Sequence, residues 1–408
     1  MSDKKKLLWI KADELYPLNS GGKIRTYNMM VELMREFDIT YFTLKDKDAE
    51  PLSDMSGYSD RQVFAHWKDN KSNKLKLVFD ALSNLCFSKL PFVIDKYTTT
   101  KVTNTLKKTL NENQFDVVIS DFLSLSENLK KLERQPSASY VVFQHNVESY
   151  IWERHYKNAG NFVSKAYFKS QWQRFLTFEK ATCKWFDGVI AVSEFDKDVF
   201  ANKFKLNNVL GHVETGVDVN SFSHFERAPK QHSLVFLGSM DWMPNIDGIE
   251  DFVKNCYPLI KAQLPNVTLT ILGRNPPNKI TLLGQNDSSI HVTGTVDDVR
   301  PFLAEAAVSV VPLRIGGGTR IKIFETMASG LPVVSTTIGA EGLPLTNGEH
   351  IIIADDSKSF ADQTVALLND TGRANEIAAS AKQLVINKYS WEIVTRDFVA
   401  MLNNINQK

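Results

Sequence analysis

Short apolar runs alternate with helix-like stretches along the whole sequence, and this alternation limits the fold more than any other feature. Each run holds about four to six aliphatic or β-branched residues, the length of a buried strand. Strands that alternate with helices pair in parallel and are covered on both faces. We therefore expect an α/β protein with doubly wound, Rossmann-like sheets. The expected strands are Leu7–Ile10, Ile39–Leu44, Val117–Ser120, Tyr140–Phe143, Gly188–Val192, Leu234–Leu237, Thr268–Leu272, Ile290–Thr293, Val308–Pro312, Pro332–Ser335 and His350–Ile353.

The alternation is interrupted by a polar stretch from Asn220 to His232, which contains Pro229 and has little periodicity. We expect one Rossmann-like domain over residues 1–220 and a second from residue 221 onward. In open parallel sheets, ligands bind at the carboxyl ends of the strands. Residues that directly follow an expected strand are therefore the first candidates for a functional site.

Charge and cysteine content exclude several classes of protein. The 48 Lys+Arg residues nearly balance the 47 Asp+Glu residues, which disfavours nucleic acid as the main partner. No stretch approaches the roughly 18 apolar residues of a membrane-spanning helix. The first apolar run is interrupted by Lys11, too early for a signal peptide. The three cysteines are far apart and suit a reducing compartment as small buried hydrophobes. We expect a cytoplasmic protein.

Positive charge is concentrated in residues 61–108, which hold 10 Lys+Arg residues against 3 Asp+Glu residues. Within this segment Leu75, Val78, Leu82 and Leu85 recur at helical spacing. A basic amphipathic helix can lie on an anionic membrane surface. The alternative is an ordinary surface helix that packs its apolar stripe on the first domain. The spacing alone leaves both interpretations open.

Three consecutive glycines between an expected strand and an expected helix form the most informative motif. Glycines let the backbone approach a ligand closely, and a helix N-terminus offers amides to an anion. The turn lacks the Gly-Lys-Ser/Thr of a Walker loop and the spacing of a nicotinamide-binding turn. We expect it to bind a nucleotide other than a nicotinamide cofactor; the alternative is a plain glycine-rich turn. The glycines are Gly316, Gly317 and Gly318.

The helix after these glycines carries the charges that a nucleotide needs. Thr319 fits as its N-cap, and Gly330 as its C-terminal stop. Arg320 and Lys322 place cations where the helix dipole disfavours them, so they call for an anionic ligand or an acidic neighbour. Glu325 lies about 9 Å along the axis from Thr319, a distance that suits ribose hydroxyls beyond bound phosphates.

The first half offers two weaker candidate sites. Gly21 and Gly22 follow the first strand and open a helix whose first turn holds Arg25, although a plain tight turn would look the same. His145 and Asn146 follow the strand Tyr140–Phe143. His145 could bind a sugar hydroxyl or phosphate, or cap the backbone locally. We find no set of residues with the spacing of metal ligands.

Together these motifs resemble glycosyltransferase family 4, whose members are retaining nucleotide-sugar glycosyltransferases of the GT-B fold. The resemblance implies two Rossmann-like domains that face each other across a cleft. It also implies a nucleotide-sugar-binding domain over residues 221–389 and a helix within residues 390–408 that crosses back to the acceptor-binding first domain. The motifs that carry it are Gly21-Gly22, His145-Asn146, Val192-Ser193-Glu194, Gly216-Val217-Asp218, Gly238, Gly273-Arg274, the glycine-rich turn with Glu325, and Ser390-Trp391.

The resemblance also implies roles for individual residues. The partners would be a nucleotide-sugar donor and a glycan or lipid-linked acceptor, as in the synthesis of surface polysaccharide or glycoconjugates, with no metal or other cofactor. Catalytic roles fall to His145, Arg320 and Lys322, and acceptor binding to Arg25 and Asn146. Donor binding falls to Gly21, Gly22, Gly238, Gly273, Arg274, Gly316, Gly317, Gly318, Thr319 and Glu325.

Two departures from the family pattern keep other functions open. Gly317 stands where the family commonly has a first glutamate, and the segment Gly238 to Asn245 lacks a basic pair. A non-catalytic nucleotide-sugar-binding protein and a nucleotide-sugar epimerase of the same fold are therefore alternatives. Because the first domain of such a transferase binds the acceptor, we expect residues 61–108 to contact an anionic membrane at its inner face.

Overall fold

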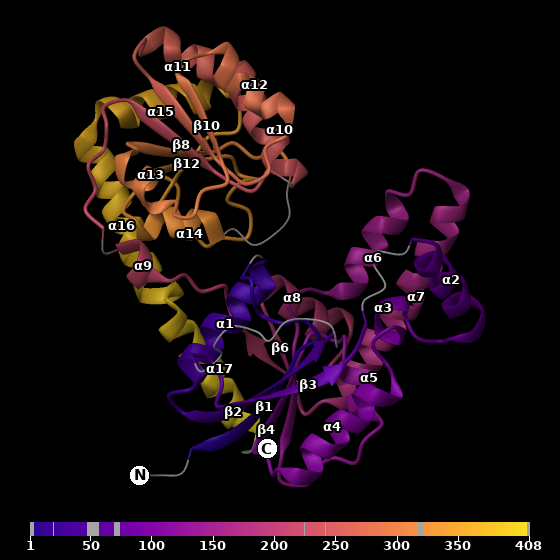
Figure 1. Ribbon diagram of the computed structural model, residues 1–408. Helices are drawn as coiled ribbons and strands as arrows, with labels where there is room; N and C mark the ends of the chain where they lie inside the picture. The colour runs from indigo at the N-terminus through magenta and orange to yellow at the C-terminus, as the bar shows by residue number, and fades with distance from the viewer. Residues whose placement is uncertain are drawn as a thin grey trace. The chain divides into compact units, whose positions relative to one another are not determined.

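The computed structural model describes residues 4–18, 20–46, 57–68, 74–223, 225–240, 242–315 and 321–405 (Figure 1). The chain divides into two compact units. Unit 1 comprises Met1–Glu214 with Val394–Lys408, and unit 2 comprises Thr215–Ile393. The first division thus lies a few residues before the expected one at residue 220. Each unit is built on a parallel sheet flanked by helices, so the expected α/β fold class is confirmed.

Unit 1 contains a seven-stranded sheet in the order β3-β2-β1-β4-β5-β6-β7, in which every neighbouring pair is parallel. The order places β1, β4 and β5 next to one another at the centre, which brings the residues that follow these strands together at one edge. The strands are β1 (Lys5–Ile10), β2 (Phe37–Lys45), β3 (Arg61–His66), β4 (Val117–Asp121), β5 (Ser139–Phe143), β6 (Gly188–Ala191) and β7 (Val209–His212).

Helices cover the two faces of this sheet because successive strand side chains point in opposite directions. From β1, Leu8 packs into a core shared with α4 and α7. Trp9 faces the other way, with its ring 5.9 Å from that of Phe398 on α17. The helices are α1 (Gly21–Leu33), α2 (Lys74–Phe87), α3 (Phe92–Asp95), α4 (Thr100–Glu112), α5 (Ser126–Lys130), α6 (Glu148–Lys157), α7 (Phe162–Trp185), α8 (Glu194–Asp198) and α17 (Trp391–Ile405).

Unit 2 contains a six-stranded parallel sheet in the order β10-β9-β8-β11-β12-β13. Strands β8 and β9 are directly followed by Gly238 and Gly273, and β11 leads toward α14. The strands are β8 (Ser233–Leu237), β9 (Thr268–Leu272), β10 (Ile290–Gly294), β11 (Val308–Val311), β12 (Val333–Ser335) and β13 (Ile352–Ile353). The helices are α9 (Val219–Ser223), α10 (Met243–Asp251), α11 (Tyr257–Gln263), α12 (Asn278–Asn286), α13 (Arg300–Glu305), α14 (Ile321–Ala328), α15 (Ser357–Asn369) and α16 (Thr371–Tyr389). Single π-helical turns follow α8 (Val199–Lys203) and α10 (Phe252–Cys256).

The expected strands all occur, and the sequence pattern missed two more. β3 and β7 are the outer strands of the unit 1 sheet, where one neighbour is absent and polar residues or glycine weaken the apolar signal. Cys183 and Cys256 are buried as expected, whereas Cys86 is exposed on α2, so that expectation was wrong for Cys86. Over the described residues, the longest apolar helical stretches fall short of what a bilayer crossing requires.

Candidate functional site

The carboxyl edge of the unit 1 sheet holds a buried cluster built around Asp121, the last residue of β4. Its Oδ2 atom accepts hydrogen bonds from Trp9 Nε1 at 3.0 Å and from Lys11 Nζ at 2.8 Å. Thr26 Oγ1, on α1, lies 2.6 Å from the same oxygen. His145 Nε2 lies 2.7 Å from Oδ1. Three segments, β1 with Lys11, α1, and the turn after β5, therefore converge on one carboxylate.

Electrostatics set the protonation state of this cluster. Burial alone would raise the pKa of Asp121, but Lys11 and His145 hold it well below its usual range. Burial lowers the pKa of His145 to about 4, although Asp121 opposes the shift. The imidazole is therefore neutral near pH 7. With an ionised carboxylate beside Nε2, the proton lies on Nε2, and Nδ1 is left as a hydrogen-bond acceptor.

The His145 ring is held between Phe122 and the start of α1. Phe122 has a φ of 68°, an unusual conformation for a bulky residue, and its ring stacks on the imidazole at a centroid distance of 4.1 Å. A Cβ atom at Gly22 would lie 3.4 Å from the Phe122 ring and 3.7 Å from His145 Nδ1. Both distances are ordinary van der Waals contacts, so the acceptor nitrogen of His145 lies close to the first turn of α1.

The other predicted residues of unit 1 occupy different positions around this cluster. Gly21 is the first residue of α1, and the Ser20 side chain makes no capping bond there. Arg25 is buried; burial lowers the pKa of its guanidinium to about 10, against the opposing charges of Asp121, Glu214 and Asp196. Asn146 is exposed. Arg25 therefore belongs to the buried cluster, and Asn146 faces solvent.

A pair of carboxyl groups fixes the turn that follows His145. Glu179 on α7 accepts hydrogen bonds from the amides of Glu148 at 2.8 Å and Ser149 at 3.0 Å, at the start of α6. It also accepts one from Gln144 Nε2 at 3.3 Å. Burial raises the pKa of both carboxyl groups, and the neighbouring Glu179 raises that of Glu148 further. The cap on α6 comes from Glu179, so local capping by His145 was wrong.

The carboxyl edge of the unit 2 sheet is shaped by closely spaced backbone. A Cβ atom at Gly273 would lie 2.0 Å from the carbonyl oxygen of Gly238, and one at Gly238 would meet the Asn245 side chain at 2.8 Å. Any side chain at these positions would displace the ends of β8 and β9. The two glycines therefore form a closely packed strip of backbone at this edge, in which Gly238 is buried. Close approach of a ligand to this strip stays a prediction.

Two of the predicted cations lie beside this strip. Lys322 Nζ donates to Asn245 Oδ1 at 2.8 Å and lies 5.0 Å from the centroid of the Phe236 ring. Asn245 in turn donates to the carbonyl oxygen of Ser239 at 2.8 Å. Arg274 is exposed, and its Nε donates to Ser239 Oγ at 2.9 Å. Gly238, Gly273, Arg274 and Lys322 are thus brought together.

Glu325 lies on α14, which packs on α16 through stacked rings of Phe324 and Tyr389. Burial raises the pKa of Glu325 to about 7. The predicted helix stop is confirmed, since Gly330 follows α14 with a φ of 71°. Five predicted residues, Gly316, Gly317, Gly318, Thr319 and Arg320, lie outside the described residues.

Several residues of these edges were missed at the sequence level. Lys11 and Asp121 stand at strand ends, by the same rule that identified His145, but nothing in the sequence shows that they meet. Arg314, between β11 and the glycines, pairs with Asp247 at 3.1 Å and with Asp251, both on α10. Within the described part of the chain, no cluster of three His, Cys, Asp or Glu side chains has a metal-binding arrangement.

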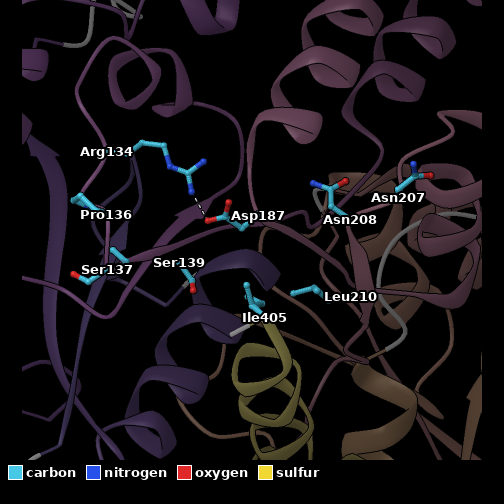
Figure 2. A pocket seen from close by; sticks show the side chains of 10 residues that line it. Arg134, Pro136, Ser137, Ser139, Asp187, Asn207, Asn208, Leu210 and Ile405 are labelled. Carbon is cyan, nitrogen blue, oxygen red and sulfur yellow. Dashed lines mark hydrogen bonds and ion pairs between the residues drawn. The ribbon is translucent and has the colours of Figure 1, made fainter. Parts of the chain in front are cut away.

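A cavity of about 420 Å³ lies at the opposite, amino-terminal edge of the unit 1 sheet (Figure 2). Figure 2 shows Arg134 and Asp187 paired at its rim, beside Ser139 at the start of β5. Asn208 precedes β7, and Ile405 comes from α17. None of the predicted site residues lines it, so it is separate from the candidate site.

The chain is similar to known proteins in sequence and in structure. Residues 231–370 match the family model of glycosyl transferases group 1. An uncharacterized 44.6 kDa protein from the cps region of Klebsiella pneumoniae is 19% identical over 94% of this chain and 96% of its own length. A phosphatidyl-myo-inositol mannosyltransferase of Mycobacterium leprae is 29% identical over 47% of this chain and 53% of its own length.

Solved structures share the fold over the whole chain. A sucrose-phosphate synthase from Thermosynechococcus elongatus has a TM-score of 0.70 at 16% identity and covers 99% of this chain and 100% of its own. Anabaena Alr3699/HepE in complex with UDP-glucose has a TM-score of 0.64 at 12% identity and covers 98% of this chain and 100% of its own.

Proposed function

The chain is a glycosyltransferase of the GT-B fold, with residues 231–370 matching glycosyl transferases group 1, and on that premise we propose that it transfers a sugar with retention of configuration. The donor would be a nucleotide-sugar, and the acceptor a glycan or lipid-linked glycan of surface polysaccharide or glycoconjugate synthesis. The similarity to the cps-region protein and to a UDP-glucose-binding structure supports these substrate classes.

The observation that carries the proposal is the strip of unit 2 formed by Gly238 and Gly273 with Lys322 and Arg274 beside it. Departure of a nucleoside diphosphate builds negative charge on phosphate oxygens. Preorganised cations and amides that face this charge stabilise the transition state. Lys322 is held in place by Asn245, so little reorganisation is needed when the charge develops.

The transfer that we propose has a simple balance of atoms. The bond between the sugar's anomeric carbon and the phosphate oxygen breaks, and the acceptor oxygen bonds to that carbon on the same face. The acceptor hydroxyl gives its proton to the departing phosphate. His145 is assigned to hold a hydroxyl of the transferred sugar through Nδ1, which is the acceptor nitrogen of a neutral ring. We expect the reaction to proceed without a metal, because cationic side chains can supply the charge.

The test begins with donor identity. A thermal-shift panel of UDP- and GDP-sugars should raise the melting temperature with one donor, because a ligand that binds only the folded state stabilises it. That donor is then incubated with lipid-linked and soluble glycans in the presence of EDTA, and the products are identified by mass spectrometry. A glycosylated acceptor with a retained anomeric configuration is the expected result.

Two variants separate the proposed roles. Lys322→Ala should weaken donor binding about tenfold or more, the cost of a lost charge-assisted contact. His145→Ala should leave the affinity for the free nucleoside diphosphate unchanged and lower transfer about 100-fold. Donor binding with no transfer to any acceptor would favour the non-catalytic alternative. Release of an epimerised sugar without an acceptor would favour the epimerase.

A further inference from the structure

Helix α2 of unit 1 presents apolar side chains to solvent. Val78 is 58% exposed, Phe79 71%, Leu82 56% and Phe87 89%. Val78 and Leu82 belong to the apolar stripe that an ordinary surface helix would pack on unit 1. For these two residues that alternative was wrong, whereas Leu85 of the same stripe is half-buried.

The opposite side of α2 explains this orientation. Asn84 is buried and accepts a hydrogen bond from Gln171 of α7 at 3.1 Å. Arg174 of α7 donates to the carbonyl oxygens of Leu85 at 2.9 Å and Ser88 at 2.8 Å. These polar contacts attach α2 to α7, and Figure 1 shows the two helices near each other in unit 1. Because they fix which side of α2 faces the protein, the apolar side is held in solvent.

The first turn of α7 adds a second exposed apolar group. Phe162 is 86% exposed and Val163 77%. The turn is well formed, since Asn161 caps it by accepting from the amide of Ser164 at 2.8 Å. Four phenylalanines among the described residues are more than half exposed. Three of them, Phe79, Phe87 and Phe162, lie on α2 or α7. We name these two exposed groups, on helices joined through Gln171 and Arg174, the α2–α7 surface; its residues are Val78, Phe79, Leu82, Phe87, Phe162 and Val163.

The charges on these helices are mostly positive. Exposed basic side chains accompany the apolar ones on α2, α6 and α7, while Glu153 is occupied by an ion pair with Lys157 at 2.8 Å. Asp80 is half-buried. Exposed basic residues on these helices include Lys76, Arg154, Lys165 and Lys169, and Lys89 lies just after α2. Aromatic residues that enter the headgroup region, flanked by lysines that meet anionic lipid, are typical of interfacial membrane binding.

We propose that the α2–α7 surface docks unit 1 on an anionic lipid bilayer. The apolar side chains enter the interface, and the surrounding lysines contact the headgroups. The surface replaces the broader segment 61–108 as the docking site, because Phe64, Trp67 and Phe92 of that segment are half-buried and Phe162 and Val163 lie outside it. That this docking serves a lipid-linked acceptor rests on the proposed function; the docking itself does not.

The experiment uses the full chain and sedimentation with vesicles at about 0.1 M salt. Vesicles contain phosphatidylcholine alone or with about one third phosphatidylglycerol. We expect binding to the anionic vesicles and little to the neutral ones. The double variant Phe79→Ser/Phe87→Ser and the double variant Phe162→Ser/Val163→Ser should each weaken binding about tenfold or more. Lys165→Glu/Lys169→Glu should weaken it by a similar factor.

Leu259→Ser/Leu282→Ser in unit 2 is the matched control, since these leucines are 41% and 47% exposed, and it should bind like the wild type. Circular dichroism and donor thermal shifts check that every variant is folded. Equal binding to both vesicle types, or unchanged binding by both phenylalanine variants, would overturn the proposal. So would self-association, seen by light scattering, that the same variants abolish. Transfer to soluble acceptors without vesicle binding would overturn only the docking, and docking without transfer only the proposed function.

Discussion

The carboxyl edges of the two sheets use charge in opposite ways. In unit 1 the charged groups are buried and bonded to one another, with Asp121 receiving Lys11 and facing His145. In unit 2, Arg274 is exposed beside the closely packed backbone of Gly238 and Gly273. A buried network holds one geometry and one protonation state. An exposed cation can exchange water for an anionic ligand. In the function that we propose, the first edge positions a hydroxyl and the second binds phosphates.

The strongest test of this contrast removes the central charge of unit 1. Asp121→Asn leaves Lys11 buried without a counter-charge, which costs about 3 kcal/mol or more of the free energy of unfolding. Urea denaturation, followed by the fluorescence of the tryptophans, measures the loss. The control is Glu305→Gln in unit 2, which breaks an exposed ion pair with Lys230 and should cost less than about 1 kcal/mol. Equal losses in the free energy of unfolding for the two variants would show that the buried network stabilises the fold no more than an exposed ion pair does.

The second test concerns the pH dependence of unit 2. Because the pKa of Glu325 is raised to about 7, its carboxylate forms as pH rises from 6 to 8. If the ionised form binds ribose hydroxyls, affinity for a nucleotide-sugar should rise about tenfold over this range, in proportion to the ionised fraction. Isothermal titration calorimetry with an intact nucleotide-sugar avoids titration of a terminal phosphate. Glu325→Gln should give a flat profile, and a wild-type profile that is already flat would contradict the assignment.

The smallest expected effect comes from the buried carboxyl pair of unit 1. The folded-state pKa is raised to about 8 for Glu148 and to about 7 for Glu179. The contribution of these two groups to stability is complete below the pKa of the unfolded chain. It is lost as pH rises through the folded-state pKa values. The side chain of the Glu148→Gln variant cannot ionise. Between pH 6 and pH 9 this variant should therefore lose about 1 kcal/mol less of its free energy of unfolding than the wild type. Thermal unfolding across this range checks it. Parallel curves for the two proteins would show that Glu148 ionises without cost.

Local rules identified Gly330, whose place after an expected helix marked it as the helix stop. Gly238 and Gly273 directly follow strands, but they were named through the family resemblance. Lys11 and Asp121 also end strands, but each looks like an ordinary surface charge until β1 and β4 are paired. Their burial, and the lowered pKa of His145, depend on neighbours about 100 residues away. No periodicity carries that information.

Helix α2 also shows what apolar spacing in the sequence cannot determine. The spacing of Val78 and Leu82 predicted an amphipathic helix, and a helix formed. Which of its sides faces solvent was decided by Arg174 and Gln171 of α7, whose bonds go to polar groups of α2. Apolar spacing usually marks the packed side, because burial of apolar area is the dominant favourable term. Here the polar contacts outweighed it.

By itself the sequence determined the alternation of strands and helices, the parallel α/β units and the glycine turns, because short-range periodicity and backbone conformation depend on neighbours in the chain. Tertiary structure alone decided the strand order, the convergence of Lys11, Asp121 and His145, and the exposure of the α2–α7 surface. Those properties arise from desolvation and from contacts between distant segments, and such contacts exist only once the chain has packed.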